Sequence, residues 1–242
     1  MMVNCIYQII LEDFITKKGG SVCMKKKLAI IHTTPVTIEP LKDLAARIIG
    51  DCEIINLVDD SILPQLSQNG GNILEIAERW ENYAKTAEQL GAECILNACS
   101  SIGELVTSIQ PKIVTPIVRI DDAMAEFAVN SADRIGVAAT LETTLRPTLE
   151  LLKEKAEKQE KQIEFEPILV ESAYQKLLAN DKEGHDSDLS AALKKLAEKV
   201  DIVVLAQASM ARVVSTFPPE EQSRFVTSPE LGMRAVKHIL YK

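Results

Sequence analysis

The chain has 242 residues, of which 46% are hydrophobic, enough for one large domain or two small ones with buried cores. A net charge of −8 and an aromatic content of 4% argue against a nucleic-acid-binding protein. The five cysteines follow no zinc-binding spacing and the apolar runs are too short to span a membrane. We therefore expect a cytoplasmic protein without a metal site, a nucleic-acid partner or a membrane partner.

The first segment, residues 1–23, differs from the rest of the chain. It is mildly apolar, but Glu12 and Asp13 interrupt it and no cationic stretch leads it, so it is a poor signal peptide. The stretch "MKKKLAIIHT" from Met24 is typical of the start of an α/β protein. We interpret residues 1–23 as a dispensable extension, with an ordinary N-terminal helix as the alternative.

Strand-like and helix-like segments then alternate along the chain. In the first part, strands are expected at 28–33, 52–60, 92–99 and 112–120, and helices at 39–50, 72–91, 101–109 and 122–132. In the second part, strands are expected at 134–140, 164–170, 201–207 and 224–228, and helices at 146–162, 188–199 and 229–242. This alternation predicts an α/β fold with mainly parallel sheets.

The second part repeats the first. "LAIIHTTPVTIEPLKDL" aligns without gaps with "IGVAATLETTLRPTLEL" at an offset of 107, and "AECILNACSSIGELV" aligns with "VDIVVLAQASMARVV" at 108. Thr33 falls on Thr140, and Cys99 falls on Gln207. We predict two pseudo-symmetric α/β halves, 24–121 plus 227–242 and 122–226. A ligand is expected between them, beyond the carboxyl ends of the strands.

Cys99 stands at the carboxyl end of a predicted strand, directly before a helix. A thiol there meets free backbone N–H groups and the positive end of the helix dipole, which lower its pKa. We therefore expect Cys99 to be a thiolate base or nucleophile. The alternative is a buried structural cysteine, an interpretation that fits Cys94 within the strand.

Hydroxyl groups are concentrated near the same strand ends. With backbone N–H groups they are suited to bind a small anion, and equally suited to cap helices. The candidates are Thr33, Thr34, Ser100, Ser101, Thr140 and Thr143. His32, at a strand end, is either an acid/base partner or a packed, hydrogen-bonded histidine, whereas His185 and His238 are expected to be solvated.

Four segments together resemble the aspartate/glutamate/hydantoin racemase superfamily: "AIIHTTPVT", "ILNACSSIG", "IGVAATLETT" and "IVVLAQASM". The resemblance covers nearly all of residues 25–242. It implies two pseudo-symmetric halves, no cofactor, a homodimer, and two cysteines on opposite faces of a small carboxylate substrate. Cys99 matches the first cysteine, Thr140 and Thr143 match substrate-binding threonines, and Ser100 and Ser101 match carboxylate-holding positions.

The departure from that family pattern is Gln207, which stands where the second cysteine is expected. A glutamine amide hydrogen-bonds a carboxylate but does not exchange protons in this role. We expect a racemase or isomerase acting on a small carboxylate such as aspartate or glutamate, with Cys99 as base and His32, or Ser209 through a water, as a second acid. The alternatives are a single-cysteine lyase (decarboxylase), a cis-trans isomerase, or a non-catalytic carboxylate-binding homologue.

Overall fold

The computed structural model describes residues 25–242, so the predicted extension 1–23 lies outside the described residues. The first half of the chain contains β1 (Lys26–His32), η1 (Pro35–Thr37), α2 (Ile38–Ile48), β2 (Cys52–Val58), α3 (Ile62–Gln68), α4 (Leu74–Gln89), β3 (Cys94–Asn97), η2 (Ser100–Ile102), α5 (Glu104–Ile109), η3 (Gln110–Lys112) and β4 (Ile117–Arg119).

The second half contains α6 (Asp122–Ser131), β5 (Arg134–Ala139), α7 (Glu142–Lys158), β6 (Glu164–Leu169), α8 (Glu171–Leu178), α9 (Lys182–Ala197), β7 (Ile202–Leu205), η4 (Ala208–Met210), α10 (Ala211–Val214), α11 (Pro219–Gln222), β8 (Phe225–Thr227) and α12 (Ser228–Leu240). No helix in this described part of the chain has the length and apolar character needed to cross a membrane.

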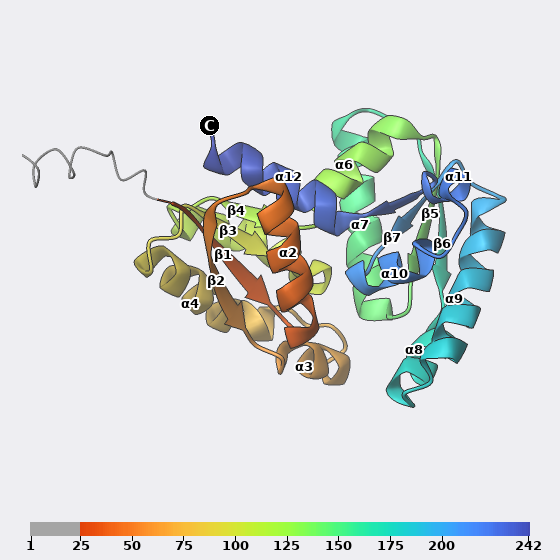
Figure 1. Cartoon of the computed structure of the whole chain (residues 1–242), viewed down its shortest axis with the longest axis horizontal. Coiled ribbons are helices and arrows are strands. Elements are labelled where there is room, and N and C mark those ends of the chain that lie inside the picture. Colours follow the sequence, from red (N-terminus) through yellow and green to blue (C-terminus); the bar gives the residue numbers. More distant parts are fainter. Residues whose placement is uncertain (1–24) are drawn as a thin grey trace, which may run out of the picture.

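The strands form two separate four-stranded sheets, ordered β2-β1-β3-β4 and β6-β5-β7-β8, in which every pairing is parallel. Figure 1 shows the two sheets in two lobes, each flanked by helices. Central strands such as β3 are buried along their whole length, which is why "CILN" is a continuous apolar run apart from its last residue. These sheets confirm the predicted α/β fold.

The internal repeat extends to the register of the strands. Leu28 pairs with Cys94 in the first sheet, and the equivalent Ile135 pairs with Ile202 in the second. Ile95 likewise pairs with Ile117, as Val203 pairs with Phe225. Because parallel strands of the same order and register end at the same level, the residues that follow β3 and β7 occupy equivalent places in the two halves.

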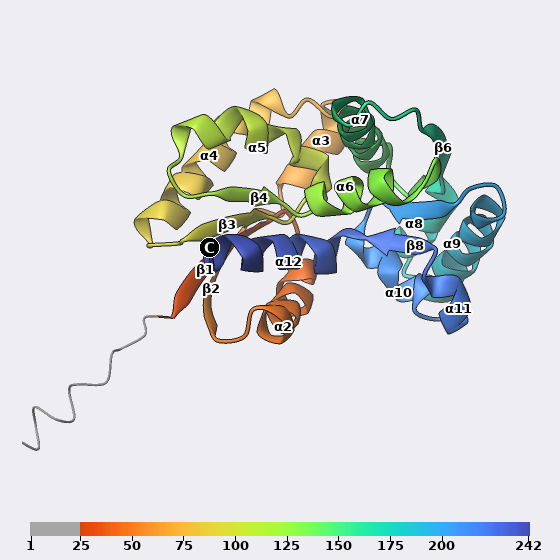
Figure 2. The same ribbon diagram turned by 90° about the horizontal axis from the view of Figure 1, so that it is seen from above.

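The helix that follows the last strand of each sheet packs in the core of the other sheet. α6 follows β4 of the first sheet, yet Met124 and Ala128 belong to the core of the second sheet. α12 follows β8 of the second sheet, yet Met233 and Val236 pack with Leu28 in the core of the first. Figures 1 and 2 show both helices at the junction of the lobes. This exchange is the packing reason for placing 227–242 with the first half, a division that stays a prediction.

Several elements differ from the expectation, among them α8, which was not expected, and α9, which begins at Lys182 rather than Asp188. α3 was not expected, because "ILPQLSQ" is short and contains Pro64. β4 covers only the end of the predicted strand 112–120. α7 begins at Glu142 rather than Arg146, so that Pro147 lies inside the helix. A proline has no N–H to donate to the carbonyl four residues back, so its position usually suggests a helix start, and here that inference was wrong.

Candidate active site

The loop after β3 surrounds the sulfur of Cys99 with hydrogen-bond donors. The hydroxyl groups of Thr33 and Ser101 and the N–H groups of Ser101 and Ile102 face this sulfur, and hydrogen bonding by them lowers the pKa of its thiol. We call this set the Cys99 cradle. The strand end supplies Thr33, and the 3₁₀ turn of η2 supplies the two N–H groups. These groups stabilise negative charge on the sulfur, as expected of a site that forms a thiolate.

The pKa of Cys99 differs from the lowered pKa that we expected from the sequence. Cys99 is only 8% exposed, and this burial raises the pKa of its thiol above its ordinary value, outweighing the hydrogen bonds that lower it. The expectation of a lowered pKa was therefore wrong. The sequence indicated the turn that follows Cys99, but not that the side chain would belong to the core of the first half, together with residues such as Ile62 and Leu105.

Gln207 holds the equivalent place in the second half. The N–H and the hydroxyl of Thr140 donate to Gln207 Oε1 at 2.7 and 2.9 Å. This repeats the contact between Thr33 and Cys99, because in each half the threonine after the first strand bonds to the side chain after the third. Since the amide oxygen of Gln207 is held by Thr140, its NH₂ group remains as the donor for a ligand.

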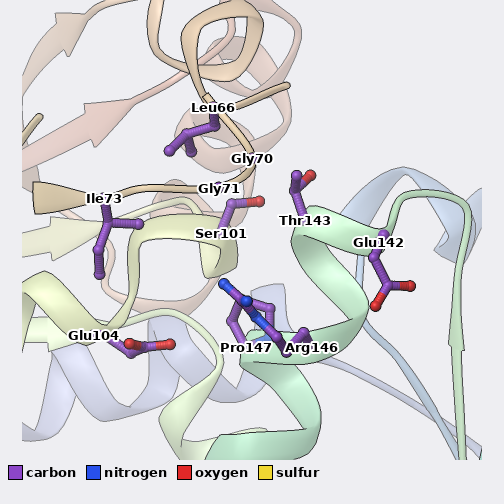
Figure 3. A pocket seen from close by; sticks show the side chains of 10 residues that line it. All are labelled: Leu66, Gly70, Gly71, Ile73, Ser101, Glu104, Glu142, Thr143, Arg146 and Pro147. Atoms are coloured by element: carbon purple, nitrogen blue, oxygen red, sulfur yellow. The ribbon is translucent and has the colours of Figure 1, made fainter. Parts of the chain in front are cut away.

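The two halves meet beside the Cys99 cradle. The Ser101 and Thr144 hydroxyls lie 3.2 Å apart and join η2 to α7. Next to this contact is a pocket lined by both halves (Figure 3): Leu66, Gly70, Gly71, Ile73, Ser101 and Glu104 from the first, and Glu142, Thr143, Arg146 and Pro147 from the second. Ser101 therefore belongs both to the cradle and to the pocket wall.

The remaining hydroxyl candidates have different surroundings in the structure. Ser100 is buried beside Cys99 at the start of η2. Thr143 lines the pocket from α7. Thr34 caps η1, with its hydroxyl accepting from the N–H of Val36 at 3.5 Å. Capping is thus the contact observed for Thr34, Thr143 is the candidate that lines the pocket, and Ser100 lies outside the pocket lining.

His32 takes the packed, hydrogen-bonded arrangement that the sequence left open. It is fully buried, and its Nδ1 and Nε2 lie 2.7 Å from Thr37 Oγ1 and 2.9 Å from Asn56 Oδ1. Burial lowers the pKa of His32, which favours the neutral ring. His185 was expected to be solvated, but it is buried in α9 with its Nδ1 2.7 Å from Asp186.

Among the described residues, no group of three or more histidine, cysteine or acidic side chains is placed to hold a metal ion. The groups described above are a buried thiol with its donors in the first half and the Gln207 amide at the equivalent strand end of the second half. The sequence pattern of the Asp/Glu/hydantoin racemase family matches residues 30–236.

This chain belongs to the Asp/Glu/hydantoin racemase family. No curated protein sequence matches it. Among solved structures, it is similar to the aspartate racemase of Picrophilus torridus at 15% identity and a TM-score of 0.69, over 89% of this chain and 94% of that one.

Two further racemase structures share the fold. Glutamate racemase from Francisella tularensis in complex with D-glutamate has 13% identity and a TM-score of 0.68, over 90% of this chain and 81% of that one. Allantoin racemase from Klebsiella pneumoniae has 15% identity and a TM-score of 0.61, over 89% and 88%. These racemase names differ in substrate, so the shared fold does not select one for this family member.

Two buried polar groups in this racemase-family chain escaped sequence reasoning. Asn97 Nδ2 donates to the carbonyl oxygen of Cys99 at 3.1 Å. Arg119 forms two hydrogen bonds of 3.1 Å with Asp121, and its guanidinium packs so closely on Gly103 that a Cβ there would lie 2.4 Å from it. The sequence signal that could have identified them is their position, because each is a polar residue at the end of a buried strand. Both groups support the loop that carries Cys99.

Proposed function

We propose that the protein is a cofactor-independent racemase- or isomerase-type enzyme acting on a small carboxylate such as aspartate or glutamate, with Cys99 as the thiolate base. The observation that carries this proposal is the Cys99 cradle, which joins a buried thiol to a pocket between the halves. A raised pKa makes the thiolate scarce but strongly basic once formed, which suits removal of a weakly acidic α-proton.

In this mechanism Cys99 takes the α-proton and becomes a neutral thiol, and the negative charge passes to the substrate carboxylate as an enolate. Ser100, Ser101 and Thr143 supply hydroxyl groups for that charge, and the Gln207 NH₂ supplies a further donor. Return of the proton from Cys99 restores the original centre, whereas a proton from the opposite face inverts it. Gln207 has no proton to give in that role, so we expect α-proton exchange to be faster than inversion.

The amide at Gln207 also favours a second candidate, a lyase (decarboxylase) or cis-trans isomerase that needs one cysteine. Two hydrogen bonds from Thr140 hold the amide oxygen of Gln207, which fixes the orientation of the side chain. Its NH₂ group can then donate a hydrogen bond to a ligand, but it cannot act as an acid. In a decarboxylase the thiol would protonate the carbanion left after loss of CO₂. That reaction needs a proton on one face only.

The test compares wild type, Cys99→Ser and Cys52→Ser with L-aspartate and L-glutamate in D₂O. α-Deuteration is followed by NMR and chirality by chromatography. We expect wild type and Cys52→Ser to exchange the α-proton and Cys99→Ser to lose exchange, because Cys52 lies in β2 away from the pocket.

Exchange that survives in Cys99→Ser would overturn the role of Cys99. CO₂ release from a substituted malonate, without exchange of either amino acid, would select the lyase. A carboxylate that raises the melting temperature without any turnover would identify a non-catalytic homologue.

A further inference from the structure

The pocket extends from Ser101 to a cation that the proposed mechanism does not use. Arg146 projects from α7, and Figure 3 shows its guanidinium reaching toward Ser101 and the Gly71 turn of the other half. A Cβ at Gly71 would lie 3.5 Å from Arg146 Nη2. The guanidinium thus reaches from the second half to the first. Arg146 is the only lysine or arginine among the described residues that line this pocket.

The turn facing Arg146 has a fixed shape. Gly70 and Gly71 have φ angles of 70° and 83°, a conformation that favours glycine. Asn69 Oδ1 accepts from the N–H groups of Gly71 and Asn72 at 3.1 and 3.0 Å. No side chain from this turn therefore blocks the approach of a ligand to Arg146.

The guanidinium of Arg146 keeps most of its hydrogen-bonding capacity. Its ion pair with Glu150 joins Nε and Oε1 at 4.0 Å, and the Arg146 side chain is 59% exposed. This distance is too long for a hydrogen bond. A guanidinium with a fork of free donors is suited to bind a carboxylate through two parallel hydrogen bonds.

Two acidic residues share the pocket, but the acidic group within ion-pair distance of Arg146 is Glu150, which is not part of the pocket lining. Partial burial, followed by the hydrogen bond and charge of Glu150, raises the pKa of Glu104, while the charges of Arg119 and Arg146 act in the opposite direction. The carboxylate of Glu142 points away from Ser101 in Figure 3. The positive charge of Arg146 is therefore the one that faces the part of the pocket next to the Cys99 cradle.

We propose that Arg146 is a specificity-determining residue that binds the side-chain carboxylate of the substrate, while the reacting carboxylate lies at the Cys99 cradle. This proposal rests on the proposed function for the orientation of the substrate. A substrate with a neutral amide in place of the side-chain carboxylate would leave the guanidinium without its partner. The site therefore distinguishes aspartate from asparagine, and glutamate from glutamine.

The experiment measures binding of L-aspartate and L-asparagine to the full chain by calorimetry. The variants are Arg146→Gln, Arg146→Lys and the control Arg234→Gln. Arg234 also sits on an exposed helix face, with its side chain 63% exposed, and pairs with a glutamate four residues away, but it lies outside the pocket.

We expect wild type and Arg234→Gln to prefer aspartate by roughly tenfold, the effect of one exposed charge-assisted contact. Arg146→Gln should lose that preference, and Arg146→Lys should keep part of it. Equal affinity of wild type for the two amino acids, or an unchanged preference in Arg146→Gln, would overturn the role of Arg146.

Binding needs no turnover, so the two proposals fail separately. If aspartate is preferred through Arg146 but Cys99→Ser retains exchange, the chemistry assigned to Cys99 is wrong and the role of Arg146 stands. If exchange depends on Cys99 but Arg146→Gln leaves the preference intact, only the role of Arg146 is wrong.

Discussion

At the scale of single residues, the pKa of Cys99 is set by two opposing effects, burial and the donors of the Cys99 cradle. Burial raises the pKa of Cys94 to about 12, with fewer hydrogen bonds to offset it, and the half-buried Cys52 also has a raised pKa. The three described cysteines thus differ in burial and in donors.

We predict that Cys99 reacts slowly with iodoacetamide at pH 7 and faster as pH rises past the value of a free thiol, because the thiolate is the nucleophile. Cys52 should react faster than Cys99, and Cys94 should react last. Peptide mass spectrometry after labelling at several pH values measures each rate. Fastest labelling of Cys99 at pH 7 would mean that the donors outweigh burial after all.

Gln207 gives the second prediction at this scale. In the proposed site, Gln207→Cys would place a thiol on the substrate face opposite Cys99. Racemisation of aspartate or glutamate should then appear or increase by about 10²–10⁴-fold, the usual contribution of one acid–base group. Chiral chromatography measures it, and Gln207→Asn is the control. Racemisation by wild type at an enzymatic rate would contradict the one-sided site, and His32→Gln would then test the remaining acid.

Glu104 gives a prediction for pH dependence. A folded-state pKa raised above the unfolded value means that the protonated group stabilises the fold. That contribution is complete below the unfolded pKa of about 4.3 and is lost as pH rises through the folded pKa. Glu104→Gln stays neutral, so its melting temperature should exceed that of wild type increasingly from about pH 4.3 upward. An advantage that is independent of pH would rule out this titration.

At the scale of elements, the loop between β3 and α5 packs at Gly103 against the guanidinium of Arg119, which forms an ion pair with Asp121. The pair is buried, with side-chain exposures of 8% and 0%. Gly103 follows η2 and leaves room for the guanidinium. The position of Cys99 therefore depends on packing under the turn as well as on the turn itself.

Gly103→Ala should lower stability by about 1–3 kcal/mol, the usual cost of overpacking, because the new Cβ would lie 2.4 Å from Arg119 Nη2. It should also lower any activity that depends on Cys99. Urea denaturation measures the first effect. Thr107→Ala, on the exposed face of α5, is the control. Unchanged stability would mean that Arg119 moves aside without cost.

The sequence predicts the features that nearby residues determine, and it does not predict those that depend on contacts between distant segments. Apolar runs and the internal repeat predicted the parallel strands, and the repeat also paired Thr33 with Thr140 and Cys99 with Gln207, residues whose contacts proved equivalent. The burial of Cys99, given only as the alternative from the sequence, arises from packing against residues distant in the chain such as Ile62. The reach of Arg146 arises where the halves meet, which no local pattern encodes.

At the scale of the whole molecule, the helix exchange brings α12 against the segment that joins the halves. Gly232 permits this contact, because a Cβ there would lie 2.5 Å from the carbonyl oxygen of Ile120. α12 packs on both α2 and α6, so it touches both halves. The position of one glycine thus affects how the halves are held together.

We predict that Gly232→Ala lowers the melting temperature. In an exposed helix the same change would stabilise by roughly 1 kcal/mol, but here the clash with backbone at Ile120 exceeds that gain. Lys237→Ala, on the exposed side of α12, is the control, and differential scanning calorimetry is the measurement. A higher melting temperature for Gly232→Ala would show that helix and segment separate easily.

Within the described residues the chain crosses from one half to the other twice, after β4 and after β8. At Gly232 the second connection lies in close contact with the first. Both chain connections between the lobes therefore lie side by side at this contact. A ligand that binds Ser101 and Thr143 together would add a further link between the halves, at the pocket that both halves line. Alkylation of Cys99 should then slow in proportion to ligand occupancy, because the ligand would lie beside the Cys99 cradle.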